Sequence, residues 1–70
     1  MEQRQIIAQR LRAARLAALL TQEQAAERLG WKQPTLSEIE AGRRSVRAEE
    51  LILFADLYGV PVVGLVEVAP

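Results

Sequence analysis

Apolar residues recur along this chain at intervals of three and four positions, with polar residues between them. Such spacing places apolar side chains on one stripe of an α-helix, because a helix turns once every 3.6 residues or so. The first stripe consists of Ile7, Leu11, Ala14 and Ala18. The second stripe consists of Leu51, Phe54, Ala55 and Tyr58. The pattern predicts helices over about residues 2–18 and 48–58.

A capping box begins the middle part of the chain, at Thr21-Gln22-Glu23-Gln24. In this motif a threonine hydroxyl and the side chain three residues later satisfy unpaired amides, so a helix is expected from here to residue 29. Glycines at positions 30, 42 and 59 each follow an apolar-periodic stretch. Because a left-handed residue commonly ends a helix, these glycines predict the ends of three helices.

Prolines mark two further helix starts. Pro34 suits the first turn of a helix, where its missing amide loses no partner, and this helix is expected to end at Ala41. The residue before a proline avoids the helical region, so Gln33 is expected to be the N-cap. Pro61 is expected to open a last short helix through about Val66. The chain is therefore predicted to be all-α, a compact five-helix bundle forming one domain over residues 1–70.

Composition narrows the chemistry. A chain of 70 residues buries only about 60% of its unfolded surface, so its core is thin. It contains neither cysteine nor histidine, which excludes disulfides, thiolate nucleophiles, imidazole bases and the usual zinc ligands. We therefore expect no metal and no cofactor. No apolar run approaches the roughly 18 residues that span a bilayer, and arginines interrupt the segment where a signal peptide needs an apolar core, so a cytoplasmic protein is expected.

The net charge is zero, but the charges are divided along the chain. Residues 1–47 contain nine basic and five acidic residues, whereas residues 48–70 contain four acidic residues and no basic one. A protein with one side facing an anion would show such a division. Chance clustering on a solvated surface would show it too, so charge alone leaves both interpretations open.

The segment over about residues 21–42 has the pattern of two short helices that meet through a tight turn. A small residue, Ala26, stands where the helices would cross, and Gly30 stands where the turn needs a positive φ. The apolar residues available for the inner faces are Leu29, Trp31, Leu36 and Ile39. The polar residues left for the outer face of the second helix are Gln33, Thr35, Ser37 and Glu38.

With this segment the sequence resembles the phage repressor/Cro-type (XRE family) helix-turn-helix domains. The matching blocks are LRAAR at 11–15, LTQEQAAERLG at 20–30, QPTLSEIEAGRR at 33–44 and LYGVPV at 57–62. The resemblance implies a five-helix domain whose third helix enters the major groove of double-stranded DNA. It also implies a sequence-specific transcriptional repressor that acts as a homodimer on a palindromic operator.

The resemblance assigns DNA contacts to particular positions. Thr21 and Gln22 match a helix start that lies on the DNA backbone, where free amides favour a phosphate. The DNA-binding face of the third helix consists of Gln33, Pro34, Thr35, Ser37 and Glu38. Gln33 is suited to adenine, Pro34 to a thymine methyl group and Glu38 to the amino group of cytosine. The cations expected to neutralise phosphates are Lys32, Arg43 and Arg44, with Arg47 a weaker candidate. For each, the alternative is an ordinary solvated surface.

Arg15 and Glu40 are expected to be structural. In relatives these positions form an ion pair between the first helix and the end of the third, and a partly buried pair is expected here. The sequence also departs from the family pattern at three positions. Leu19 replaces a common glycine, Lys32 replaces a serine or threonine cap, and Ala25 replaces a larger apolar residue.

The last third of the chain carries more apolar residues than so small a core can bury. The surplus consists of Ile52, Leu53, Leu57, Val62, Val63, Leu65 and Val66. Exposed apolar patches mark interfaces, so these residues are expected to form a homodimer contact or to dock a protein partner or a C-terminal regulatory domain. The alternative is a wrongly assigned core face.

Two other function classes compete with DNA binding. An interaction module, such as an antitoxin that clasps a toxin through its apolar C-terminal surface, does not need cations beside the third helix, although many antitoxins also bind DNA. An enzyme is not expected, because the chain has no histidine, cysteine or glycine-rich phosphate loop. Glu38 and Glu40 lie two positions apart, so they face different directions on a helix and cannot act as a carboxylate pair.

Overall fold

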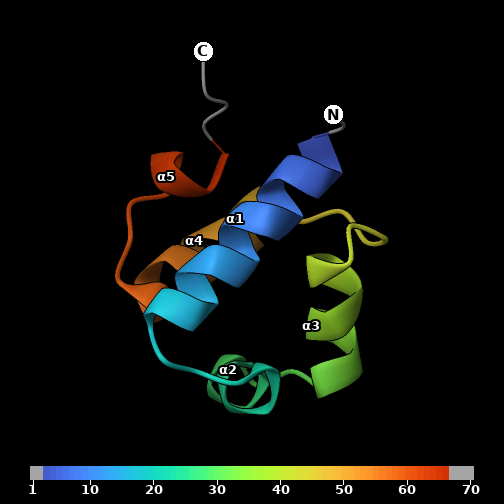
Figure 1. The fold of residues 1–70 in the computed structure, drawn as a ribbon, viewed down its shortest axis with the longest axis vertical. Coiled ribbons are helices and arrows are strands. Elements are labelled where there is room, and N and C mark those ends of the chain that lie inside the picture. Colours follow the sequence, from blue (N-terminus) through green and yellow to red (C-terminus); the bar gives the residue numbers. More distant parts are fainter. Residues whose placement is uncertain (1–2, 67–70) are drawn as a thin grey trace.

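Residues 3–66, the part of the chain that the computed structural model describes, form five α-helices (Figure 1). They are α1 (Gln3–Ala17), α2 (Gln22–Leu29), α3 (Gln33–Glu40), α4 (Ala48–Tyr58) and α5 (Val63–Val66). The predicted all-α five-helix fold is confirmed over this range. The predicted start of the first helix, at Glu2, lies outside the described residues. The last helix begins at Val63, because Pro61 and Val62 form the turn that leads into it.

The longest helix, α1, holds the bundle together. It contacts α3, α4 and α5, while α2 contacts α3 and α4 (Figure 1). The five large side chains with the least exposure come from α1, α3, α4 and α5, and they are Phe54, Leu11, Leu36, Ile39 and Leu65. The ring of Trp31 meets Phe54 edge-on, with centroids 5.3 Å apart, and partly covers the core between α2 and α3. No helix among residues 3–66 is long and apolar enough to span a membrane.

Each of the first four helices ends in the same backbone motif. The residues with positive φ that follow them are Leu19 (60°), Gly30 (74°), Gly42 (76°) and Gly59 (68°). The next amide donates to the carbonyl five positions back, from Leu20 to Arg15, Trp31 to Ala26, Arg43 to Glu38 and Val60 to Ala55. This bond defines the Schellman motif, which satisfies carbonyls that the helix leaves unpaired. The helix ends predicted from the three glycines are confirmed.

Leu19 takes the left-handed conformation without the freedom of glycine. Its φ is 60°, and its side chain is 88% exposed, so no packing contact offsets the backbone strain. A left-handed conformation costs a residue with a side chain about 1–2 kcal/mol. Leu20, next in the chain, is buried, and its carbonyl accepts a hydrogen bond from Arg15 Nη1 at 2.9 Å. Burial of Leu20 therefore decides where α1 ends.

One residue assigned to an interface from the sequence belongs to the core. Leu65 is only 1% exposed, so its interface assignment is wrong, because α5 turns back onto α1. Leu57 is partly buried against the same cluster and keeps part of its surface exposed, so its interface assignment stays a prediction. The surplus residues that do remain exposed are Ile52, Leu53, Val62, Val63 and Val66.

Candidate nucleic-acid interface

The two helices of the predicted helix-turn-helix pack tightly around a small residue. Ala26 in α2 is 1% exposed, and Ala25 beside it is fully buried, so α2 lies close to its neighbours. Gly30 then reverses the chain with its positive φ. The smaller residue at position 25 therefore allows close packing here.

Lys32, and not Gln33, is the N-cap of α3. Lys32 is extended, with φ −85° and ψ 145°, whereas Gln33 is the first helical residue and Pro34 the second. The prediction that Gln33 caps the helix is wrong, because the Thr35 amide donates to the Lys32 carbonyl at 3.0 Å and closes the turn one residue earlier. Gln33 is therefore helical although it precedes a proline, because the hydrogen bond of the first turn stabilises this conformation.

The polar side of α3 faces away from the core. Leu36 and Ile39 are buried beneath the helix, while Pro34 and Glu38 are exposed on its outer side. Gln33, Thr35 and Ser37 lie at the border of this face and are partly exposed. The candidate contact residues of α3 are thus all at the surface of the described domain.

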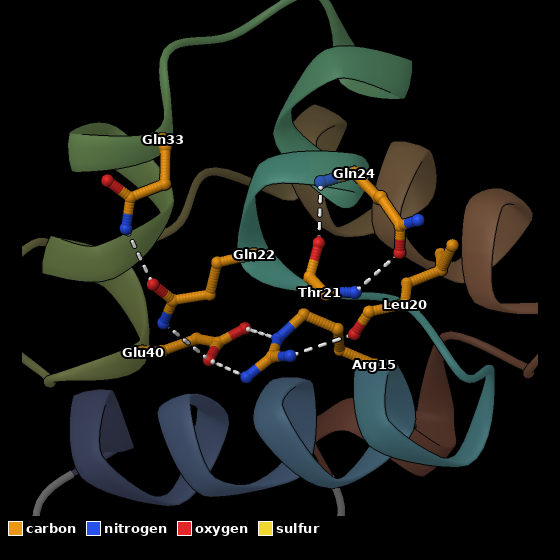
Figure 2. Close-up of polar contacts among 7 residues, drawn as sticks. All are labelled: Arg15, Leu20, Thr21, Gln22, Gln24, Gln33 and Glu40. Carbon is orange, nitrogen blue, oxygen red and sulfur yellow. Dashed lines mark hydrogen bonds and ion pairs between the residues drawn. The ribbon is translucent and has the colours of Figure 1, made fainter.

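A buried ion pair holds the end of α3 against α1 (Figure 2). Arg15 Nε donates to Glu40 Oε2 at 2.7 Å, and Arg15 Nη2 donates to Glu40 Oε1 at 3.0 Å. The two side chains are only 8% and 3% exposed. The hydrogen bond to Glu40 raises the pKa of the Arg15 guanidinium, against the opposing effect of burial. The pair has the geometry of a two-pronged contact, which orients both partners.

Gln22 extends this pair to the start of α3 (Figure 2). Its Nε2 donates to Glu40 Oε1 at 3.1 Å, and its Oε1 accepts from Gln33 Nε2 at 2.7 Å. The Gln33 amide is thereby oriented, and it keeps one donor hydrogen and its carbonyl oxygen for another partner. Adenine offers one acceptor and one donor in the major groove, which is the complementary set. The sequence predicts a DNA contact for both glutamines but not the bond between them, because no local spacing signals it.

Thr21 has the structure of an N-cap. Its hydroxyl accepts from the Gln24 amide at 3.1 Å, and its own amide donates to Gln24 Oε1 at 2.9 Å (Figure 2). Both halves of the predicted capping box are present. The exposed position of Thr21 leaves the start of α2 open to solvent.

The arginines beside α3 are paired with carboxylates. Arg43 Nε donates to Glu38 Oε2 across an exposed pair. Arg44 makes a two-pronged contact with Glu50, at 2.9 Å to Oε2 and 3.2 Å to Oε1. Arg44 holds the pKa of Glu50 below its usual value, against the opposing effect of burial. The basic and acidic parts of the sequence therefore meet at Arg44 and Glu50, and the division of charge along the chain does not persist in space there.

Glu50 is a structural residue that sequence reasoning missed. Its Oε1 also accepts from the Arg47 amide at 2.9 Å, at the first turn of α4. Arg47 itself is exposed, with its Nη2 3.9 Å from Glu50 Oε2. A glutamate three residues into a helix is the signal that could have revealed this cap. Lys32 remains exposed at the start of α3.

Comparison with known proteins gives consistent matches. A family described as a helix-turn-helix domain matches residues 6–68. The structure is similar to that of the S. venezulae BldD DNA-binding domain, with a TM-score of 0.83 and 32% identity, covering 94% of this chain and 99% of that one. A crystal structure of the DNA-binding domain of BldD gives a TM-score of 0.82, 31% identity and the same coverage of 94% and 99%. No curated protein matches the sequence.

Proposed function

The chain belongs to the helix-turn-helix domain family, and on that premise we propose that it binds double-stranded DNA as a sequence-specific transcriptional regulator. In this proposal α3 lies in the major groove with its polar side toward the bases. The observation that carries it is the exposed polar face of α3, held in place by the buried contact between Arg15 and Glu40. The similarity to a solved DNA-binding domain supports the same conclusion.

The contacts divide into two kinds. Base contacts are assigned to the outer face of α3, which consists of Gln33, Pro34, Thr35, Ser37 and Glu38. Phosphate contacts are assigned to the start of α2 and to the flanking cations, which are Thr21, Gln22, Lys32, Arg43 and Arg44. Arg44 is the weaker cation, because Glu50 holds it and leaves its side chain 35% exposed.

We further propose that two copies bind a palindromic operator and act as a cytoplasmic repressor. The exposed apolar side chains of α4 and of the segment around α5 would form the contact, and they are Ile52, Leu53, Val62, Val63 and Val66. A C₂ pair would place the two copies of α3 about 34 Å apart, which is one turn of DNA. A strict monomer in sedimentation at high concentration, with and without DNA, would contradict the dimer.

The same apolar patch favours a second candidate, a module that docks a protein partner such as a toxin. Both candidates use Ile52, Leu53 and Val63, so mutation of the patch does not separate them. They differ in the polar face of α3, which only the DNA-binding function requires.

Selection of binding sites from random duplexes tests the proposal. We expect one palindromic motif, and an affinity that falls steeply with salt because several phosphates are neutralised. Gln33→Ala should relax the preference at one base position, at a cost of about 1–3 kcal/mol. Lys32→Ala should weaken all sequences alike and reduce the salt slope by about one. Selection that yields no motif at either low or high salt would end the proposal.

A further inference from the structure

The four Schellman motifs differ in the side chains that they bring together. The motif usually carries an apolar contact between the residue whose carbonyl accepts the defining bond and the residue, five positions later, whose amide donates it. α2 pairs Ala26 with Trp31, and α4 pairs Ala55 with Val60, in keeping with this rule. At the end of α3 the corresponding residues are Glu38 and Arg43, and they form an ion pair.

The backbone turn at the end of α3 holds Glu38 and Arg43 next to each other. The Arg43 amide donates to the Glu38 carbonyl at 3.0 Å, and Gly42 supplies the positive φ that the turn needs. The two side chains therefore meet without a long-range contact. The carboxylate also lies on the outer face of α3, the side proposed to meet the bases, with Pro34 one turn before it.

The two arginine pairs beside α3 differ in how readily they open. The side chains of Arg43 and Glu38 are 66% and 48% exposed, and one nitrogen of Arg43 makes the contact. Exposed ion pairs of this kind contribute little to stability, so an outside partner can replace either member. The Glu50 carboxylate is 8% exposed and accepts from two Arg44 nitrogens and from the Arg47 amide. Opening that pair would leave a buried charge without its partner.

Resting on the proposed DNA-binding function, we propose that Glu38 is an internal counter-anion that keeps Arg43 from phosphate until a base engages the carboxylate. A carboxylate only accepts hydrogen bonds, so its favourable partners in the major groove are the amino groups of cytosine and adenine. An amino group that donates to Glu38 weakens its hold on Arg43, and the guanidinium then pairs with a nearby phosphate. Over a base without that donor, the ion pair stays closed and the phosphate contact is lost.

The consequence is that Glu38 determines specificity in two ways. A wrong base at its position loses the contact to Glu38 and also the phosphate contact of Arg43. Binding to non-specific DNA is weakened for the same reason, because one cation is already neutralised within the protein. Glu38 therefore acts through Arg43 as well as through its own base contact.

The test is a double-mutant cycle on a short duplex of random sequence. Glu38→Gln should bind this duplex about two- to five-fold more tightly than wild type, the range expected for release of an exposed ion pair. Its salt slope should steepen by about 0.9, which corresponds to one additional phosphate. In the Arg43→Gln background the same substitution should change neither the affinity nor the slope.

Two comparisons make the result decisive. Glu49→Gln removes another exposed carboxylate, 3.9 Å from Arg47, and its effect should be the same in both Arg43 backgrounds. If Glu38→Gln also acts equally in both backgrounds, the carboxylate repels DNA directly and the proposal is overturned. Wild-type protein that binds no duplex at all would instead overturn the proposed function itself. Circular dichroism checks that each variant is folded. We expect folded variants, because the substituted side chains are exposed.

Discussion

The contact between Arg15 and Glu40 fixes α3 to α1, and Glu40→Gln measures what that contact contributes. The substitution keeps the shape of the side chain and removes its charge. In the wild type the guanidinium donates to both carboxylate oxygens, at 2.7 and 3.0 Å. In the variant one of these oxygens becomes an amide nitrogen, which donates and cannot accept. The buried Arg15 cation then has no counter-charge.

The expected loss is large for a domain of this size. Removing one partner of a buried ion pair costs about 3–5 kcal/mol, because the other charge stays buried alone. We expect about 3 kcal/mol, since Arg15 keeps its hydrogen bond to the Leu20 carbonyl at 2.9 Å. A domain of 70 residues is stable by about 4–10 kcal/mol in total. The melting temperature should therefore fall by roughly 12–24 °C.

Urea and thermal unfolding, followed by circular dichroism, would measure the change. The control is Glu49→Gln, whose carboxylate is 71% exposed and 3.9 Å from Arg47, and which should change the free energy of unfolding by less than about 0.5 kcal/mol. The double variant Arg15→Met, Glu40→Leu should recover most of the loss, because an apolar pair has no charge to desolvate. A loss for Glu40→Gln no greater than that of the control would refute the reasoning.

Further predictions concern three single residues, Leu19, Tyr58 and Glu50. Leu19→Gly should stabilise the fold by about 0.5–1 kcal/mol, because relief of the left-handed strain exceeds the entropy cost of glycine. Leu19→Ala, which keeps Cβ, should show no such gain when both variants are compared by thermal melting. Among residues 3–66 the buried Tyr58 hydroxyl has no hydrogen-bond partner, so Tyr58→Phe should leave the free energy of unfolding unchanged or raise it. Burial raises the pKa of Tyr58 to about 12, so the wild type should lose stability as pH rises from about 10 through 12. Urea titrations across this range would measure the loss. A parallel loss in Tyr58→Phe would show that it does not come from ionisation of Tyr58. Arg44 lowers the pKa of Glu50, so the Glu50 carboxylate stabilises the fold above pH 4.5, and this contribution disappears as pH falls further. Glu50→Gln should therefore reduce the loss of unfolding free energy at acidic pH. A variant that loses as much stability in acid as the wild type would contradict the prediction.

Local signals in the sequence determined the helices and their ends. The capping box at Thr21 and the positive φ of Gly30 act within a few residues, so the chain around them is enough to specify them. The apolar spacing of α4 likewise predicted its bounds, Ala48–Tyr58, because one helix face must be buried whatever it packs against. The ion pair between Arg15 and Glu40 followed from the family resemblance, since its members lie 25 residues apart and no local pattern joins them.

Tertiary packing decided the partners of individual side chains. Leu65 has the same local signals as the exposed valines near it, but α5 lies against α1 and buries it. The bond between Gln22 and Gln33 exists because α2 packs against α3. The bond between Arg44 and Glu50 exists because the loop after α3 returns to α4. Helix formation depends on neighbours within about four residues, whereas burial and charge pairing depend on distances that only the packed chain defines.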